Sequence, residues 1–181
     1  MKTAITREIA LTEGVTAEFK DGRLLVRGKA GILERSFSHP KIILEVTSKA
    51  VKLRFDKASK REKTVLGSFE SHIQNMIIGV KEPHVYKLKI CSSHFPMNVT
   101  VSGKEMIIKN LFGEAVPRKV PLVDKVDVKV NGQEIIVTSL DKELAGQIAA
   151  RIEQTCRVKN KDIRIFQDGC YIVEKAGKGT L

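Results

Sequence analysis

Residues 59–83 read SKREKTVLGSFESHIQNMIIGVKEP. Apolar residues recur in this stretch at spacings of three and four, a pattern that predicts one amphipathic helix of about 20 residues. The capping-box pair Ser59 and Glu62 marks its start, because these side chains satisfy free N–H groups, and Pro83 follows its end. The stripe comprises Val65, Leu66, Phe69, Ile73, Met76, Ile77 and Val80. A helix with one apolar stripe must cover another element, so this stretch predicts a layered fold.

A second helix of the same kind is expected in the C-terminal half. Its apolar residues recur every four positions after Asp141 or Ser139, either of which can act as the N-cap. Gly67 and Gly146 occupy matching places early in the two helices, where a small residue would let each helix lie close to its sheet. The stripe of the second helix comprises Leu144, Ile148, Ile152 and Cys156, with Ala145 and Ala149 beside it.

Short β-type runs precede each helix in the same order. The Asn131-Gly132 dipeptide signals a hairpin between two of them, because both residue types tolerate positive φ. Residues 85–90 alternate as a strand and begin the second half after Pro83. The other runs are 15–19, 24–26, 42–46 and 51–55, then 99–101, 106–108, 126–130 and 135–137.

These patterns predict an α+β fold made of two similar repeats, each an antiparallel β-sheet covered on one face by a single long α-helix. We expect the first repeat over residues 1–82 and the second over residues 83–181, the second ending in a hairpin and a tail.

Charge narrows the class of partner. The chain has 181 residues, with 32 Lys and Arg against 21 Asp and Glu, so its net charge is +11. Such an excess favours a polyanion, either nucleic acid or an acidic membrane. No apolar run approaches the roughly 18 residues of a membrane span, and the N-terminus lacks the apolar core of a signal peptide. We therefore expect a soluble, cytoplasmic, basic protein. The excess divides almost evenly between the halves, so charge alone does not identify the binding half.

Metal and redox chemistry have little support. The three cysteines, Cys91, Cys156 and Cys170, are widely spaced and odd in number. This pattern argues against a disulfide framework and fits a reducing compartment. Cys91 and His94 form a single CxxH pair, which cannot complete the four-coordinate shell of structural zinc. We predict no metal site and no cofactor.

Catalytic signatures are equally sparse. The sequence has no Walker loop, dinucleotide fingerprint or nucleophile elbow. A pairing of Cys170 with a distant histidine remains as a catalytic hypothesis without local support. An enzyme acting on a nucleotide would need convergent polar groups, which the sequence does not offer. We predict that the protein is not an enzyme and has no catalytic residues.

Residues 28–31 form a GxxG sequence, the pattern of the KH-domain backbone clamp. That clamp lies between two helices, whereas here β-like runs 24–26 and 32–37 flank it. A tight connection between strands is the favoured interpretation, although Arg27 and Lys29 beside the glycines leave a phosphate site open. Aromatic residues make up only 5% of the chain, with no Trp. Weak stacking capacity with strong charge favours contacts to the backbone and shape of folded RNA over capture of single strands.

The C-terminal region is the most informative about binding. Residues 159–164 are basic, and Gln167-Asp168-Gly169 then indicates a turn between two short strands. Such a hairpin could present backbone N–H groups and cations to phosphates. An edge hairpin with a frayed terminus is the structural alternative.

The chain resembles a known family, the sixth large-subunit ribosomal protein, in its archaeal and eukaryotic form. The resemblance covers almost the whole chain, and its motifs occur in the right order. They are HFPMNV at 94–99, NLFGE at 110–114 continuing to PRK at 117–119, GQIAA at 146–150 with IEQ at 152–154, and Asp162, Arg164, FQDG at 166–169 and YIV at 171–173. One departure is Cys170, where an aliphatic residue is expected, and a free cysteine serves as a small hydrophobe.

The resemblance implies a structural constituent of the large ribosomal subunit that binds 23S-type rRNA, mostly through the second half. It implies a place near the sarcin–ricin region, the factor-binding centre and the stalk base, with neighbouring large-subunit proteins and translation factors nearby and no membrane. The alternative is an extra-ribosomal two-domain RNA-binding factor.

The candidate rRNA-binding residues have two origins. The family motifs support Arg164, Gln167, Asp168, Gly169, Tyr171 and Lys175, and charge alone adds Arg157, Lys159, Lys161 and Lys178. We expect the cations to contact phosphates. Gln167 and Asp168 would bond 2′-hydroxyls or shape the turn, and Gly169 would allow close approach of the backbone.

Overall fold

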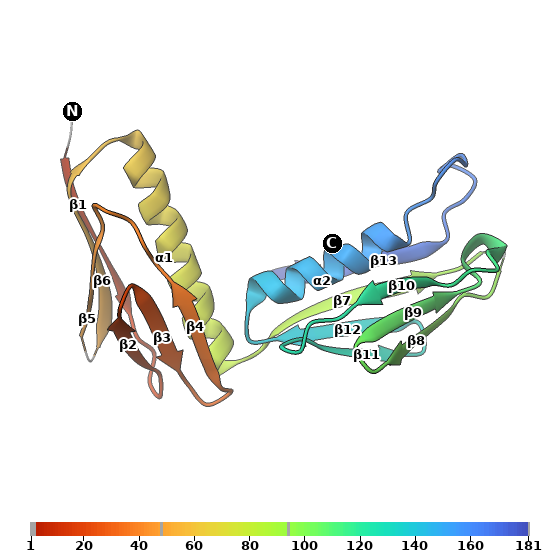
Figure 1. The fold of residues 1–181 in the computed structure, drawn as a ribbon, viewed down its shortest axis with the longest axis horizontal. Helices are drawn as coiled ribbons and strands as arrows, with labels where there is room; N and C mark the ends of the chain where they lie inside the picture. Colours follow the sequence, from red (N-terminus) through yellow and green to blue (C-terminus); the bar gives the residue numbers. More distant parts are fainter. Residues whose placement is uncertain (1–2, 48, 94, 181) are drawn as a thin grey trace. The chain divides into compact units, whose positions relative to one another are not determined.

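A computed structural model describes residues 3–47, 49–93 and 95–180. The His94 of the family motif therefore lies outside the described residues. The chain divides into two compact units, with Pro83 at the end of the first and His84 at the start of the second (Figure 1). This division falls one residue after the expected boundary.

The first unit contains two antiparallel three-stranded sheets, in the orders β1-β6-β5 and β2-β3-β4. Helix α1 packs against strands of both sheets, and its buried side chains, among them Leu66, Ile73 and Val80, meet core residues of β3 and β6 such as Leu24 and Leu53 (Figure 1). The elements are β1 (Thr3–Ala10), β2 (Thr16–Lys20), β3 (Arg23–Arg27), β4 (Ile32–Ser36), β5 (Ile43–Val46), β6 (Ala50–Ala58) and α1 (Lys60–Lys81).

The second unit repeats this order and adds two strands. Its sheets have the orders β10-β9-β8 and β11-β12-β7-β13-β14, and α2 packs against β7, β12, β13 and β10 (Figure 1). The elements are β7 (His84–Cys91), β8 (Asn98–Ser102), β9 (Glu105–Lys109), the 3-10 turn η1 (Leu111–Gly113), β10 (Arg118–Pro121), β11 (Asp127–Asn131), β12 (Glu134–Ser139), α2 (Lys142–Thr155), β13 (Gly169–Lys175) and β14 (Lys178–Thr180). The predicted α+β fold with two repeats is confirmed, and the structure adds that each repeat divides its strands between two sheets.

The helix starts follow the predicted caps. The backbone N–H of Ser59 donates to Glu62 at 2.8 Å, and its hydroxyl donates to the same carboxylate. In α2 the N-cap is Asp141, whose carboxylate accepts from the N–H of Glu143 at 2.9 Å. Ser139, the alternative candidate, instead donates its hydroxyl to the Lys125 carbonyl at 2.8 Å.

The glycine prediction holds for one helix only. A Cβ at Gly146 would lie 3.1 Å from the Tyr86 hydroxyl oxygen, so a small residue there does let α2 approach β7. At Gly67 no described atom would lie within 4 Å of a Cβ, so the prediction is wrong for α1, whose Gly67 faces outward.

The 28–31 segment is a strand connection, as favoured. The Gly28 N–H donates to the Gly31 carbonyl at 2.9 Å, and the Ala30 N–H donates to the Val80 carbonyl at 2.8 Å. A Cβ at Gly28 would lie 2.6 Å from the same Val80 oxygen, so glycine is required for this approach. The loop caps the carbonyl end of α1, a place that repels phosphate.

Two turn predictions need correction. Asn131 pairs with Glu134, so the two turn residues of the β11–β12 hairpin are Gly132 and Gln133, with Gly132 at φ +59°. A glycine in the first turn position is typical of a type II′ turn. The predicted hairpin around Gln167-Asp168-Gly169 is wrong. Residues 156–168, between α2 and β13, form no strand, and β13 pairs with β7 and β14 instead.

Candidate nucleic-acid interface

Three loops meet at one end of the second unit, beyond the end of β7 and the start of β13 (Figure 1). We call this surface the loop end and define it as residues 92–93, 95–97, 110–117 and 156–168. The Phe112 and Phe166 rings lie 6.0 Å apart in an edge-to-face arrangement. A Cβ at Gly113 would lie 3.5 Å from the Phe95 ring. Aromatic contacts thus join segments that are far apart in the sequence.

Arg118 ties two of the loops together. Its guanidinium donates two hydrogen bonds to the Glu114 carboxylate, at 2.8 and 2.6 Å. It also donates to the carbonyl oxygens of Thr155, at 2.6 Å, and Arg157, at 3.0 Å, at the end of α2. The hydrogen bonds from Arg118 lower the pKa of Glu114, and the same contact raises the pKa of Arg118. With its side chain only 16% exposed, Arg118 positions the loops and offers little to a ligand.

A buried carboxylate secures the third loop. Asp168 is 5% exposed, and its Oδ1 accepts hydrogen bonds from the N–H and the hydroxyl of Ser93. This pair joins the segment after β7 to the segment before β13. Asp168 therefore joins two distant segments and does not shape the predicted local turn, and a bond to a 2′-hydroxyl would compete with Ser93.

The segment around η1 has a strained backbone. Asn110 and Phe112 adopt φ values of +61° and +52°, in the left-handed region that residues other than glycine rarely occupy. The Asn110 side chain donates to the Pro96 carbonyl at 3.1 Å, which offsets part of the strain. Such conformations persist only where the surroundings over-determine them, and they cluster at binding sites.

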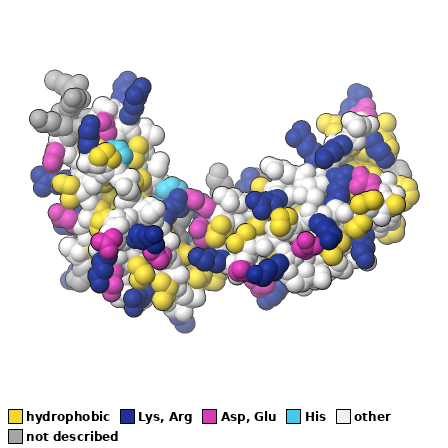
Figure 2. Space-filling view, in the orientation of Figure 1, with side chains coloured by type: hydrophobic (Ala, Val, Ile, Leu, Met, Phe, Trp, Pro, Cys, Tyr) yellow, Lys and Arg dark blue, Asp and Glu magenta, His cyan; other side chains and the backbone are white. Residues whose placement is uncertain are grey.

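The structure brings four of the predicted cations together on one loop. Arg157, Lys159, Lys161 and Arg164 all lie exposed between α2 and β13. The Lys161 amine lies 4.6 Å from the Phe166 ring centroid and 5.6 Å from that of Phe112, so cation–π attraction holds it over these rings. Figure 2 shows Lys and Arg side chains next to hydrophobic ones at this end of the unit. The exposed hydrophobic residues of the loop end are Phe95, Val116, Ile163 and Ile165.

Arg164 is not a free cation. Its guanidinium donates to both carboxylate oxygens of Asp162, with the shortest distance 2.7 Å, although 86% of the arginine side chain is exposed. The Arg164 hydrogen bonds lower the pKa of Asp162. Any phosphate that binds Arg164 must compete with Asp162.

Gln167, Gly169 and Tyr171 form the base of this loop. The Tyr171 hydroxyl donates to the Gln167 carbonyl at 2.8 Å, and the Gln167 amide donates to the Arg164 carbonyl at 3.1 Å. Gly169 is buried, with Tyr171 and Cys156 atoms 3.4 to 3.5 Å from a Cβ placed there. A Cβ there would thus make ordinary van der Waals contacts with residues of its own unit.

The structure does not bring the last two candidates to the loop end. Lys175 is exposed at the far end of β13, six residues and about 20 Å along the strand from Gly169. Lys178 lies in β14, and its side chain is outside the part of the structure that is described.

Sequence reasoning missed several residues of this region. Arg118 appeared only within the PRK family motif at 117–119, and its role depends on carbonyl groups 37 and 39 residues away. Lys89 and Gln133, which line a cavity beside the loop end, were also missed. The one signal in the sequence was the charged Lys89 between the apolar Leu88 and Ile90 in an alternating strand. This alternation indicates that Lys89 faces away from the core, as the structure shows.

Other kinds of site find no support in the described residues. They contain no group of three or more His, Cys, Asp or Glu side chains placed to hold a metal ion. Neither of their helices is long and apolar enough to cross a membrane.

Comparison with known proteins identifies close relatives. Residues 11–83 and 95–169 match the family model described as Ribosomal protein L6. The large ribosomal subunit protein uL6 of Methanococcus vannielii is 44% identical over 174 residues, which cover 96% of both chains. The uL6 protein of Methanosarcina mazei is 42% identical over 176 residues, 97% of this chain and 100% of the relative. That of Nanoarchaeum equitans is 42% identical over 185 residues, 98% of this chain and 96% of the relative.

Proposed function

The chain belongs to the ribosomal protein L6 family, and on that premise we propose that it binds rRNA of the large ribosomal subunit through the loop end of its second unit. The family consists of ribosomal structural proteins, so the chain is a large-subunit ribosomal protein and not an enzyme. The protein is located in the cytoplasm, as part of the ribosome.

The single observation that carries the choice of surface is the convergence of four exposed cations on a loop that internal contacts hold in place. Arg157, Lys159, Lys161 and Arg164 lie between α2 and β13, and Arg118 and Asp168 anchor the ends of that loop. Cations on a preorganised loop bind phosphates at a lower entropic cost than cations on a mobile tail. They position a protein on folded RNA without reading its sequence.

Finer placement rests on the family motifs. We propose that the bound RNA is the last domain of 23S-type rRNA, near the sarcin–ricin region and the stalk base. Neighbouring large-subunit proteins and translation factors would then lie close by. The first unit would face outward near the stalk base.

The salt dependence of binding tests the surface. The full chain would be titrated with transcribed large-subunit rRNA at several salt concentrations, as wild type and as the Lys161→Ala, Arg164→Ala double variant. Each lost phosphate contact should reduce the slope of log K against log salt by about 0.7 to 0.9. The matched control is Lys60→Ala with Arg61→Ala in the first turn of α1, which removes the same charge from the first unit.

We expect the loop variant to bind more weakly with a shallower slope and the α1 variant to stay near wild type. Equal slopes in both variants would count against the loop end. Retention of the protein on large subunits through a high-salt wash separates a ribosomal constituent from an extra-ribosomal RNA-binding factor, which should wash off.

A further inference from the structure

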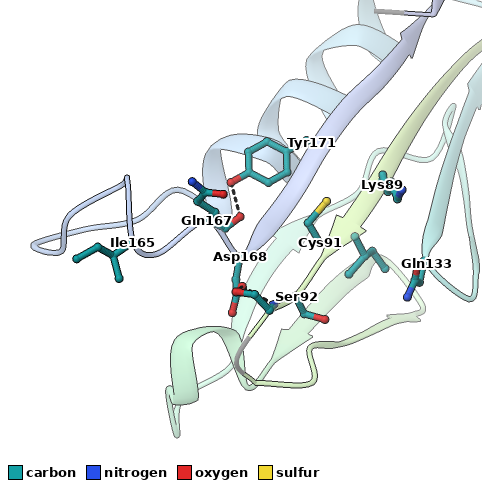
Figure 3. Close-up of a pocket in the computed structure, with 10 residues that line it drawn as sticks. Lys89, Cys91, Ser92, Gln133, Ile165, Gln167, Asp168 and Tyr171 are labelled. Atoms are coloured by element: carbon teal, nitrogen blue, oxygen red, sulfur yellow. Dashed lines mark hydrogen bonds between the residues drawn. The ribbon is translucent and has the colours of Figure 1, made fainter.

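An open cavity lies beside the loop end, between the end of β7, the β11–β12 turn and the start of β13 (Figure 3). Its volume is about 570 Å³. That size falls within the range of small-molecule sites, about 300 to 1,000 Å³. The phosphate-binding surface proposed above does not account for it.

Tyr171 forms an aromatic wall of this cavity (Figure 3). The residue is 43% exposed, and only Phe95 among the other aromatic residues described is comparably exposed. The hydrogen bond from its hydroxyl to the Gln167 carbonyl and its place in β13 fix the ring. Burial raises the pKa of Tyr171. A fixed, half-exposed ring on a rigid strand is the usual platform for stacking a nucleobase.

The polar groups of the cavity suit the remaining parts of a nucleotide. The Gln133 amide and the Ser92 hydroxyl can each donate and accept, as base edges require. Lys89 supplies a cation for a phosphate (Figure 3). Asp168 is the one acid among the lining residues, and its Oδ1 already accepts two hydrogen bonds from Ser93. The cavity therefore does not favour a cationic occupant.

The cavity is continuous with the loop end. Ile165, which is 62% exposed, lines it from the loop that carries Lys161 and Arg164. RNA bound to those cations would therefore lie beside the opening of the cavity. An unpaired base that leaves its stack can exchange base–base contacts for the Tyr171 ring and the Ile165 side chain.

We propose that this cavity accepts one unpaired nucleobase of the rRNA, stacked on Tyr171 and bonded at its edge by Gln133. The proposal rests on rRNA binding by the loop end. It adds a second site, which binds a base, whereas the four cations bind phosphates.

Tyrosine fluorescence gives a direct test, because the chain contains two tyrosines and no tryptophan. In the Tyr86→Phe variant, Tyr171 is the sole fluorophore. In the Tyr171→Phe variant the sole fluorophore is Tyr86, which lies against Gly146 of α2. Transcribed large-subunit rRNA should quench emission of the first variant by more than half, because a stacked base quenches tyrosine. The second variant should change little after the same correction for RNA absorbance.

Affinity gives the second readout. Tyr171→Leu should weaken rRNA binding about 5- to 150-fold, the range expected for loss of one base–aromatic stack, with the salt slope unchanged. Tyr171→Phe, which keeps the ring, should retain most of the affinity, and Gln133→Ala should cost a few-fold. Thermal unfolding of each variant shows whether it folds.

The outcomes separate the two proposals. If wild type binds with a steep salt slope but Tyr171 is not quenched and Tyr171→Leu binds as tightly, the nucleobase site is overturned and the phosphate surface stands. If wild-type binding has no salt slope, the proposed function fails and this site fails with it.

Discussion

Asp168 Oδ1 accepts two hydrogen bonds from Ser93, one from the backbone N–H and one from the hydroxyl, each at 2.6 Å. The two residues are 75 positions apart in the chain. This contact fixes the start of β13 against the end of β7, where the loops of the proposed interface meet. Asp168, which the sequence predicted either to bond a 2′-hydroxyl or to shape a turn, is thus part of the support beneath the proposed interface.

Replacement of Asp168 by alanine should destabilise the second unit. The substitution leaves the Ser93 groups without their acceptor, which costs about 1 to 3 kcal/mol in free energy of unfolding. Urea denaturation would measure the change. Asp124→Ala is the control, because Asp124 and its partner Lys104 are both more than 70% exposed, and surface pairs contribute about 0 to 1 kcal/mol. Equal effects of the two substitutions would contradict a supporting role for Asp168.

Two glycine substitutions should act in opposite directions. Gly28→Ala forces a Cβ to within 2.6 Å of the Val80 carbonyl oxygen, and such overpacking costs about 1 to 3 kcal/mol. Gly67→Ala places a Cβ in open space on the exposed side of α1, where alanine stabilises a helix by about 1 kcal/mol relative to glycine. Thermal unfolding should show a lower midpoint for the first and a higher midpoint for the second. A stabilising Gly28→Ala would refute the close contact between this loop and the end of α1.

Local patterns explain most of what the sequence could predict. The stripe and capping box of α1 involve residues three or four positions apart, so they were readable without the fold. Strand β1 was missed because Arg7 interrupts its apolar alternation. In the structure Arg7 pairs in register with the buried Leu53 of β6, and its guanidinium lies 3.7 Å from the Glu70 carboxylate. Only the tertiary fold supplies that carboxylate.

The candidate site likewise has some features that local sequence predicts and others that only the tertiary fold supplies. Charge alone pointed to Arg157, Lys159 and Lys161 and a family motif pointed to Arg164, and their exposure on the 156–168 loop needs no distant partner. The burial of Asp168 and the cavity beside Tyr171 both depend on β13 pairing with β7, about 80 positions earlier in the chain. The predicted hairpin failed for this reason, since non-local pairing prevailed over the local turn signal.

The capping box of α1 should make stability depend on pH in the acid range. Hydrogen bonds from the Ser59 hydroxyl and N–H lower the pKa of Glu62 from its ordinary 4.5 to about 2. A carboxyl whose pKa is lower in the folded chain stabilises it above the unfolded value, and this contribution is lost as pH falls through the folded value. Wild type should therefore exceed Glu62→Ala in unfolding free energy at pH 6. The difference should shrink between pH 4.5 and 2, and a constant difference would argue against the box.

Release of Arg164 from Asp162 should strengthen RNA binding. Asp162 accepts three hydrogen bonds from the Arg164 guanidinium and one from its N–H. Asp162→Asn removes the competing charge, while the amide oxygen can still accept from the Arg164 N–H and so preserve the turn. We expect tighter binding of large-subunit rRNA and a steeper salt slope, because Asp162 no longer weakens the phosphate contact of Arg164. The increase should be at most about 0.7 to 0.9, the contribution of one full phosphate contact.

Asp124→Asn is the matched control for that experiment. It changes the net charge equally but frees Lys104, which lies outside the loop end. A general charge effect would steepen both slopes alike, whereas a phosphate contact at Arg164 steepens only the first. If Asp162→Asn instead weakens binding, then Asp162 holds Arg164 in its binding geometry and the ion pair is a supporting contact like that of Asp168 with Ser93.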